Sequence, residues 1–292
     1  MSSPAAPDGA AQRRSWPDAA QAFLTRIVAV VVSLLVAVEI MVLLVGVVTR
    51  YFHMPLVWSD ELASILFLWL AMLGTVLAFQ RDGHMRMTAL LNKQAPAVRA
   101  RFELFARAAS LAFAAILGWP AVAYALDEII ITTPALGISN AWRAFALPIG
   151  VGLLGVSALL KIHSGGIGKT GWAGLAVAAV AIGAALCMGP KMRGLGNLNL
   201  LLFFVLGVGA MVLTGVSIAF SFGLATIGYL AMATTVPMTV MVGRMDEGMS
   251  HLILLAVPLF VFLGLLLEMT GMARAMVRFL ASLLGHVRGG LS

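Results

Sequence analysis

The chain has 292 residues, of which 61% are hydrophobic and only 11% are charged. A soluble globular domain is closer to about half apolar and about a quarter charged, so this composition excludes a water-soluble fold and favours a lipid bilayer as the solvent. The net charge of +7 does not indicate nucleic-acid binding, because the basic residues lie between apolar runs and not along a stripe with aromatics. Basic loops beside apolar runs are typical of the cytoplasmic side of membrane proteins.

The polar residues 1–24 predict a disordered cytoplasmic tail. Arg13 and Arg14 precede an apolar run, which is also how a signal peptide begins. However, the run at 27–48 is too long for the apolar region of a signal peptide and has no cleavage site of small residues. We interpret it as a spanning helix, which needs about 20 residues.

Seven more apolar runs follow, and together they predict an all-α, polytopic membrane protein with about eight transmembrane helices. We place these seven near residues 57–79, 103–126, 142–162, 171–189, 197–214, 216–235 and 251–269. The first of them opens with Trp58-Ser59-Asp60-Glu61. Ser59 is expected to cap its first turn, and the two acids are expected to favour the positive end of the helix dipole.

The distribution of Lys and Arg between the loops predicts the orientation, with both termini in the cytoplasm. With eight spans, one side receives Arg13, Arg14, Arg26, Arg81, Arg86, Lys93, Arg99, Arg101, Lys161, Lys169, Arg274, Arg278 and Arg288. The opposite side receives Arg50 with Asp60 and Glu61, and Arg143 with Asp127 and Glu128. Lys191 and Arg193 are exceptions on that side, as is Arg244, which Asp246 and Glu247 accompany.

Two Gly-rich polar stretches divide the chain. Residues 25–163 predict a four-helix block, 164–196 a linker with one connecting transmembrane helix, and 197–292 the start of a second block. The stretch 163–170 superficially resembles a phosphate-binding loop, but it lacks the GxxxxGK[ST] spacing and a preceding strand. We interpret it as a loop.

No pattern in the sequence predicts an enzyme. There is no HExxH pair and no Gly-x-Ser-x-Gly elbow, the arrangements that zinc peptidases and serine hydrolases need. No nucleophile and base are paired at membrane depth. We therefore predict no catalytic residue, no cofactor and no protein-bound metal.

Glu39 is the one acid well inside the first span. A charge at that depth is costly, so Glu39 is a functional candidate. It could relay a proton or an ion. Alternatively, it could make a hydrogen bond between helices or pack in the bundle as a protonated acid, and the lack of a second buried charge favours these structural roles. Pro258 interrupts the last predicted span, where it could free a backbone carbonyl for an ion or simply bend the helix.

Tryptophan and glycine side chains in the spans also have two interpretations. Trp58 and Trp142 fit anchors at the membrane interface better than substrate-stacking residues. Gly215, Gly223 and Gly228 permit a close approach of neighbouring helices. We interpret all five residues as structural.

The order of several short motifs resembles a known family. The first block carries Arg50-Tyr51-Phe52, Trp58-Ser-Asp-Glu-Leu62, Arg81-Asp-Gly-His-Met-Arg-Met87, Thr133-Pro-Ala-Leu-Gly137, Trp142 and Leu147-Pro148. Over residues 25–163 these motifs resemble the small permease subunit, the DctQ-type protein, of tripartite ATP-independent periplasmic (TRAP) transporters. The second block carries Thr214-Gly-Val-Ser-Ile-Ala-Phe220, Leu254-Leu-Ala-Val-Pro-Leu-Phe260 and Gly285-His-Val-Arg-Gly-Gly290, and is similar to the start of the large, DctM-type subunit. Ser217 stands where that family usually has Pro.

The resemblance implies a fused permease in the bacterial inner membrane. Its implied partners are a periplasmic solute-binding receptor that delivers an organic acid, the remaining part of the large permease subunit, and membrane lipid, with no nucleic acid. The large subunit would move substrate and sodium in symport, by an elevator-like motion against a scaffold that includes the small subunit. A membrane scaffold or assembly protein without transport is the alternative.

In the family, the substrate and ion sites lie in re-entrant hairpins that follow the stretch resembling Gly289-Gly290-Leu291. We expect those sites beyond Ser292, and we expect residues 1–292 alone not to transport. The candidates for structural or interface roles are Arg50, Trp58, Asp60, Glu61 and Pro258.

Overall fold

The computed structural model describes residues 16–83, 94–164 and 196–284, and the regular elements in these ranges are helices. The first block contains α1 (Trp16–Tyr51), α2 (Val57–Gln80), α3 (Pro96–Asp127), the 3-10 turn η2 (Glu128–Ile130), α4 (Ala141–Ala144) and α5 (Ala146–Ser164). The second contains α8 (Leu198–Leu200), the π-helical segment η4 (Leu201–Gly207), α9 (Val208–Leu213), α10 (Ile218–Ala233), α11 (Met238–Met249), the 3-10 turn η5 (Leu252–Leu255), α12 (Ala256–Met269) and α13 (Met272–Leu284). The prediction of an all-α membrane protein is confirmed.

Seven of the predicted spans coincide with described helices, and the eighth, 171–189, lies outside the described residues. Five stretches are long and apolar enough to cross a membrane: Trp16–Tyr51, Val57–Gln80, Val98–Ile130, Ala141–Ser164 and Leu252–Met269. The other two, Leu198–Leu213 and Ile218–Ala233, are apolar but shorter. They fall below the length of about 20 residues that an upright span needs.

Helix α1 begins at Trp16, so the part of the predicted tail from 16 to 24 is helical and not disordered. Pro17 lies in its first turn, where a proline has no intrahelical hydrogen bond to lose, and Asp18 favours the positive end of the helix. The alanines that follow are strong helix formers. The apolar pattern used to place the helix start therefore missed a polar first stretch.

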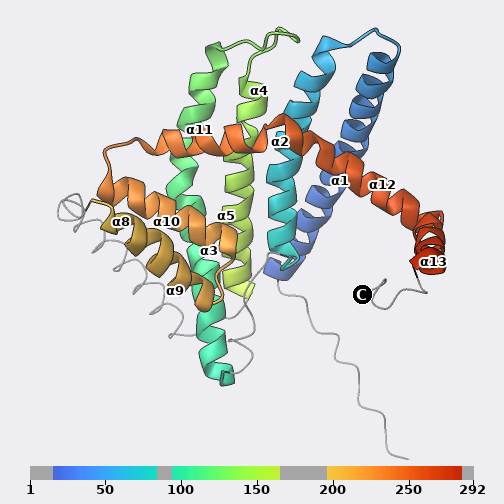
Figure 1. Ribbon diagram of the computed structural model, residues 1–292. Helices are drawn as coiled ribbons and strands as arrows, with labels where there is room; N and C mark the ends of the chain where they lie inside the picture. The colour runs from blue at the N-terminus through green and yellow to red at the C-terminus, as the bar shows by residue number, and fades with distance from the viewer. Residues whose placement is uncertain (1–15, 84–93, 165–195, 285–292) are drawn as a thin grey trace, which may run out of the picture.

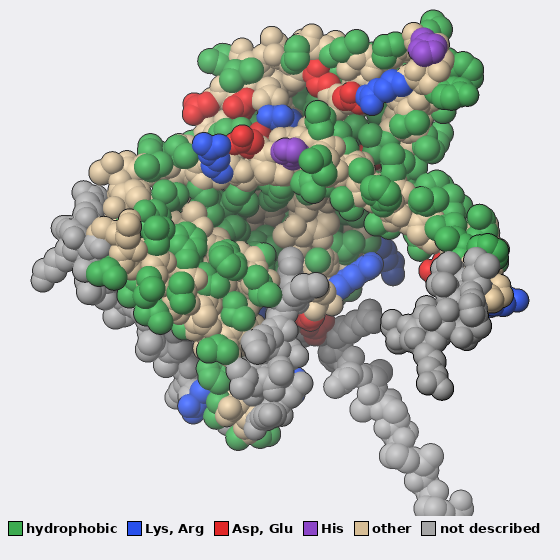
Figure 2. Space-filling model, in the orientation of Figure 1, with side chains coloured by type: hydrophobic (Ala, Val, Ile, Leu, Met, Phe, Trp, Pro, Cys, Tyr) green, Lys and Arg blue, Asp and Glu red, His purple; other side chains and the backbone are tan. Residues whose placement is uncertain are grey.

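Helices α1, α2, α3 and α5 run side by side as a bundle (Figure 1). We call the end that holds the α1–α2 connection and the α3–α4 loop the upper end, as it appears in that view, and the opposite end the lower end. In the space-filling view, charged side chains gather toward the upper end, while hydrophobic side chains cover much of the sides below (Figure 2). Exposed apolar residues such as Val30, Leu34 and Val38 suit contact with lipid tails.

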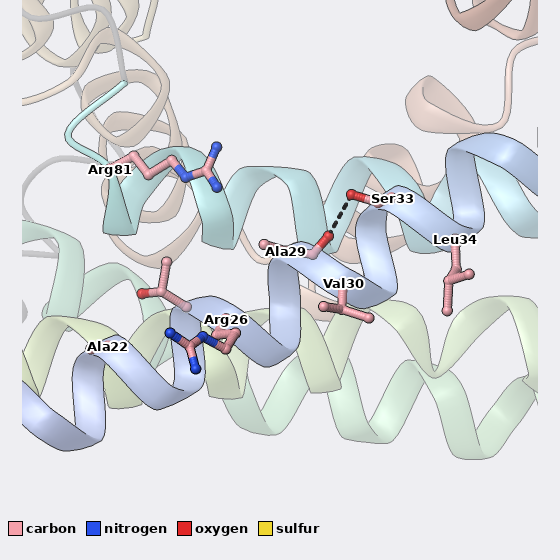
Figure 3. Close-up of a pocket in the computed structure, with 8 residues that line it drawn as sticks. Ala22, Arg26, Ala29, Val30, Ser33, Leu34 and Arg81 are labelled. Atoms are coloured by element: carbon pink, nitrogen blue, oxygen red, sulfur yellow. Dashed lines mark hydrogen bonds between the residues drawn. The ribbon is translucent and has the colours of Figure 1, made fainter.

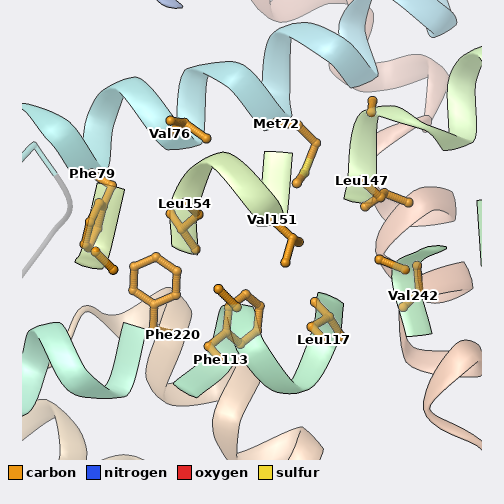
Figure 4. Packing of buried hydrophobic residues seen from close by; sticks show 14 of the residues in the cluster. Met72, Val76, Phe79, Phe113, Leu117, Leu147, Val151, Leu154, Phe220 and Val242 are labelled. Carbon is orange, nitrogen blue, oxygen red and sulfur yellow. The ribbon is translucent and has the colours of Figure 1, made fainter. Parts of the chain in front are cut away.

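The two blocks share one hydrophobic core. Phe220 of α10 lies between two aromatic rings of the first block, with its centroid 5.9 Å from Phe79 and 5.5 Å from Phe113. Val242 of α11 is also buried in this cluster, close to the upper end (Figure 4). The second block is therefore packed into the bundle and not merely tethered to it.

Glycine makes the closest of these contacts possible. A Cβ added to Gly223 of α10 would lie 2.5 Å from Cε2 of Phe113 in α3, which is too close for two carbon atoms. The expectation that Gly223 permits a close approach of two helices is thus matched by a specific neighbour in the other block.

Helix α10 and helix α11 connect opposite ends of the bundle. Helix α10 starts at Ile218, next to the Phe79 contact near the lower end of α2. Helix α11 lies across α3 and toward α2 at the upper end (Figure 1). The second block therefore contacts the bundle near its lower end through Phe220 and near its upper end through α11.

Candidate functional site

Polar side chains that the sequence nominated gather at the upper end of the bundle. Arg50, in the last turn of α1, forms an ion pair with Asp60 in the first turn of α2. The prediction that Ser59 caps α2 is wrong, because the helix already begins at Val57. The hydroxyl of Ser59 instead donates a 2.7 Å hydrogen bond to the carbonyl of Leu56. Trp58 is partly exposed on this end of α2.

Glu61 connects α2 to the loop between α3 and α4. Its Oε2 accepts a 2.7 Å hydrogen bond from the backbone N–H of Ala135. The loop turns back at Gly137, whose φ of 67° lies in the left-handed region that glycine adopts without strain. The N–H of Gly137 donates to the carbonyl of Thr133 at 3.0 Å, and this closes the turn that presents Ala135.

Arg143 of α4 connects the first block to the second. Its Nη2 donates a 2.7 Å hydrogen bond to Oδ2 of Asp246 in α11, and the hydroxyl of Tyr124 in α3 donates to the same oxygen at 2.9 Å. The side chain of Asp246 is 3% exposed and that of Arg143 is 24% exposed. Three helices from two blocks therefore meet at one carboxylate.

The carboxylate of Asp246 is incompletely satisfied. Its Oδ1 and the Nε of Arg143 are buried and have no hydrogen-bond partner in the part of the chain that the structure describes. Burial raises the pKa of Asp246, and this outweighs the opposing effects of the Arg143 guanidinium and the Tyr124 hydroxyl. A buried ion pair of this kind adds little net stability, since desolvation offsets much of the attraction.

A small cavity of about 240 Å3 lies beside these residues, lined by Glu61, Thr133, Asn140 and Arg143 among others. Asn140 also donates a hydrogen bond to Glu128 at the end of α3. We call Glu61, Tyr124, Glu128, Arg143 and Asp246 the polar cap. It joins α2, α3, α4 and α11 and fixes the loop between α3 and α4.

Glu39 lies apart from the polar cap, within the bundle. Glu39 belongs to α1 and its side chain is fully buried. Neither carboxylate oxygen has a hydrogen-bond partner within residues 16–83, 94–164 and 196–284. The interhelical hydrogen bond that we considered for Glu39 is not present among the described residues. A buried polar group without a partner is unusual and calls for an explanation.

Pro258 lies in the first turn of α12, directly after the 3-10 turn Leu252–Leu255. It therefore marks the start of an α-helix and does not interrupt one, because a proline in a first turn removes no α-helical hydrogen bond. Its side chain is buried and lines an apolar groove between α1, α2 and α12.

Sequence reasoning missed Asp246 because it placed residues 236–250 in a loop. A signal for α11 was present: Met238, Met241, Val242, Met245 and Met249 recur at the spacing of one helical face, and all five pack into or against the core. Pro237 precedes the helix and occupies its N-cap. Among the described residues, no group of three or more His, Cys, Asp or Glu side chains is placed to hold a metal ion.

The fold and the polar cap define a polytopic α-helical membrane protein in which two helical blocks are packed together. Residues 39–165 match the family of tripartite ATP-independent periplasmic transporters, DctQ component, and residues 205–292 match the DctM component of the same transporters. The chain belongs to the TRAP transporter permeases and is a fusion of a DctQ-type and a DctM-type segment.

Curated relatives carry the same combination. The chain is 27% identical over 257 residues to the sialic acid TRAP transporter permease protein SiaT of Haemophilus influenzae. The aligned region covers 83% of the chain and 41% of the relative. It is 24% identical over 248 residues to the isethionate TRAP transporter permease protein DctMQ of Oleidesulfovibrio alaskensis. This second alignment covers 81% of the chain and 37% of the relative.

A separate small subunit matches as well. The sialic acid TRAP transporter small permease protein SiaQ of Vibrio cholerae is 32% identical over 100 residues, covering 33% of the chain and 56% of the relative. The chain thus spans about two fifths of the length of the fused relatives. These relatives are named as transporter permeases and not as enzymes, in agreement with the prediction from the sequence.

Proposed function

We propose that the chain is a permease component that takes up an organic acid together with sodium and receives it from a periplasmic solute-binding protein. The observation that carries this proposal is the occurrence of a DctQ-type and a DctM-type segment in one chain, in the same combination as in fused relatives. The relatives are named for sialic acid, C4-dicarboxylate and isethionate. These compounds share an anionic group, which supports an organic anion as the substrate class.

In this proposal the first block is the scaffold and the second is the beginning of the transporting part. The packing of Phe220 between Phe79 and Phe113, and the ion pair between Arg143 and Asp246, support a rigid attachment of the two. Ligands for substrate and sodium are expected in the remainder of a large permease segment, outside the residues described above.

The test is uptake of a labelled organic acid into liposomes that hold a sodium gradient, with a cognate solute-binding protein added outside. We expect uptake when the chain is joined to the remaining large-permease segment of a fused relative, and none when the solute-binding protein is left out. Uptake that does not depend on that protein would contradict the assignment. Equal uptake with potassium in place of sodium would contradict the coupling.

We also infer that the lower end of the bundle faces the cytoplasm of an inner-membrane protein, with both termini on that side. The loop asymmetry of Lys and Arg supports this orientation. Reporter fusions after Lys93 and after Arg278 should both report the cytoplasm, and a fusion after Arg244 should report the periplasm. A periplasmic signal at either of the first two positions would overturn the orientation.

A further inference from the structure

A hollow of about 680 Å3 lies at the lower end of the bundle, beside the first turns of α1 and the end of α2. Arg26 and Arg81 lie at one end of it, while Val30 and Leu34 line it farther along α1, toward the middle of the bundle (Figure 3). Thr25 and Ala29 complete the wall on α1. The hollow therefore has a basic end and an apolar end.

The position of the two arginines fits the boundary of a membrane. Arg26 immediately precedes the apolar run of α1, and Arg81 immediately follows α2. From Arg26 to Leu34 the helix rises by roughly 12 Å, at about 1.5 Å per residue. That distance runs from the level of lipid headgroups into the acyl chains, since the hydrocarbon core of a bilayer is about 30 Å thick.

The two arginines also differ from Lys161 and Arg107, two nearby cations that have partners within the protein. Lys161 donates hydrogen bonds to Asp82 at 2.7 Å and to the carbonyl of Phe79 at 2.9 Å, and Arg107 donates to the carbonyl of Lys161 at 3.1 Å. The guanidinium groups of Arg26 and Arg81 form no ion pair or hydrogen bond with the described residues, and no acidic side chain among those residues lines the hollow.

The remaining polar groups of the wall already have partners. The hydroxyl of Thr25 donates to the carbonyl of Gln21 at 2.7 Å, and that of Ser33 donates to the carbonyl of Ala29 at 2.8 Å (Figure 3). The available donors in the hollow are thus the two guanidinium groups. Guanidinium groups bind phosphate oxygens in pairs of hydrogen bonds, and basic pockets between spanning helices are sites for anionic headgroups.

We propose that this hollow binds an anionic phospholipid, with its phosphodiester on Arg26 and Arg81 and the start of one acyl chain against Val30 and Leu34. A bound lipid of this kind would lie along α1, beside the end of α2. It would supply the negative charge that the protein itself does not provide there.

The experiment uses the purified chain in a mild detergent and measures lipid binding by native mass spectrometry, with phosphatidylglycerol and phosphatidylcholine as the two probes. We expect phosphatidylglycerol to be retained in preference. The double variant Arg26→Gln/Arg81→Gln should bind it about 30-fold more weakly, since each basic side chain near a membrane surface contributes about 1 kcal/mol toward anionic lipid.

The matched control is Arg101→Gln, which removes an exposed charge from the same end of the bundle, away from the hollow. It should leave the retention of phosphatidylglycerol unchanged. A second variant, Val30→Trp, fills the apolar end while both arginines remain, and it should also weaken lipid binding. Circular dichroism of each variant should match that of the unchanged chain.

Three results would overturn the proposal. One is equal retention of phosphatidylglycerol and phosphatidylcholine. Another is a loss of phosphatidylglycerol binding in the double variant that is no larger than twice the loss of binding in Arg101→Gln. The third is displacement of the lipid by millimolar inorganic phosphate with no effect of Val30→Trp, which would assign the two arginines to a small free anion.

Discussion

Arg143 and Asp246 are separated by 103 residues of chain, yet Nη2 of the first donates a 2.7 Å hydrogen bond to Oδ2 of the second. Arg143 belongs to the DctQ-type segment and Asp246 to the DctM-type segment. The pair therefore joins the two parts of the fusion at the upper end of the bundle, opposite the aromatic contact of Phe220.

Asp246→Ala should destabilise the chain by about 2 kcal/mol, because Arg143 and Tyr124 would both lose their acceptor. Asp246→Asn should remain within about 1 kcal/mol of the unchanged chain, because the amide oxygen still accepts from Arg143 and Tyr124 and the cost of burying the carboxylate charge is removed. Thermal unfolding midpoints in detergent measure both. Glu247→Gln, at an exposed neighbour paired with Arg244, is the control. If Asp246→Ala unfolds at the same temperature as the control, the pair does not join the blocks.

The stability of the chain should depend on pH through Asp246. Because burial raises its pKa, the neutral carboxyl is more favourable relative to the carboxylate in the folded protein than in the unfolded one. The stability that this form contributes is present below the ordinary carboxyl pKa of about 3.9 and is lost as the pH rises through the raised value. The unfolding midpoint of the unchanged chain, measured relative to Asp246→Asn, should therefore fall as the pH rises from about 4. A relative midpoint that rises with pH would show that the ion pair dominates.

Glu61→Gln in a complete permease should lower the amount of assembled protein more than the affinity for substrate. The carboxylate accepts the N–H of Ala135 and so holds the α3–α4 loop on α2, and a neutral amide accepts a weaker hydrogen bond. Protein level by immunoblot and substrate affinity by uptake separate the two effects. Glu103→Gln removes an exposed partner of Arg99 and is the control. A normal protein level with a selective loss of sodium coupling would assign Glu61 to the ion pathway.

Gly223→Ala should weaken the packing of the second block on the first. The new methyl group would overlap the ring of Phe113, and crowding of this kind typically costs about 1–3 kcal/mol. Gly209→Ala is matched to it, because that glycine has open space around its Cβ position and alanine favours a helix. Thermal midpoints should fall for the first variant only. Equal midpoints would mean that Phe113 moves aside without cost.

Glu39→Leu should leave the unfolding midpoint unchanged or raise it, because the buried carboxyl has no hydrogen-bond partner among the described residues to lose. Gln80→Leu is the comparison: Gln80 is also buried, but it donates a 2.9 Å hydrogen bond to Ser157, so its replacement should lower the midpoint. If the unfolding midpoint falls by the same amount in Glu39→Leu and in Gln80→Leu, Glu39 has a hydrogen-bond partner. Loss of uptake by a complete permease with Glu39→Leu, at unchanged stability, would indicate a relay.

The hydrophobic runs of the sequence were sufficient to predict the class of fold, because a backbone in a bilayer must satisfy its own hydrogen bonds and apolar runs of about 20 residues do so as helices. They were insufficient for η4 and for α11. The π-helical segment Leu201–Gly207 has no polar or conformational marker in an apolar run. In α11 the charged residues Arg244, Asp246 and Glu247 hide a helical face of methionines that packs on α3.

Candidate residues were predicted unevenly for a related reason. Arg50 pairs with Asp60 only ten residues away, so the loop between two spans brings them together, and sequence proximity is enough to nominate both. Tyr124, Arg143 and Asp246 meet only through the packing of three helices from two blocks. Without homologous sequences, no pattern within one helix shows such a contact.

The aromatic contact of Phe220 with Phe79 and Phe113 has a consequence for how the two segments assemble. Because the interface is a continuous apolar core, the DctQ-type and DctM-type segments should recognise each other even as two polypeptides, as in relatives with a separate small permease protein. A covalent connection then adds no specificity. It raises the effective concentration of one segment near the other and fixes their ratio at one to one, so that translation of a single message replaces the search for a partner in the plane of the membrane.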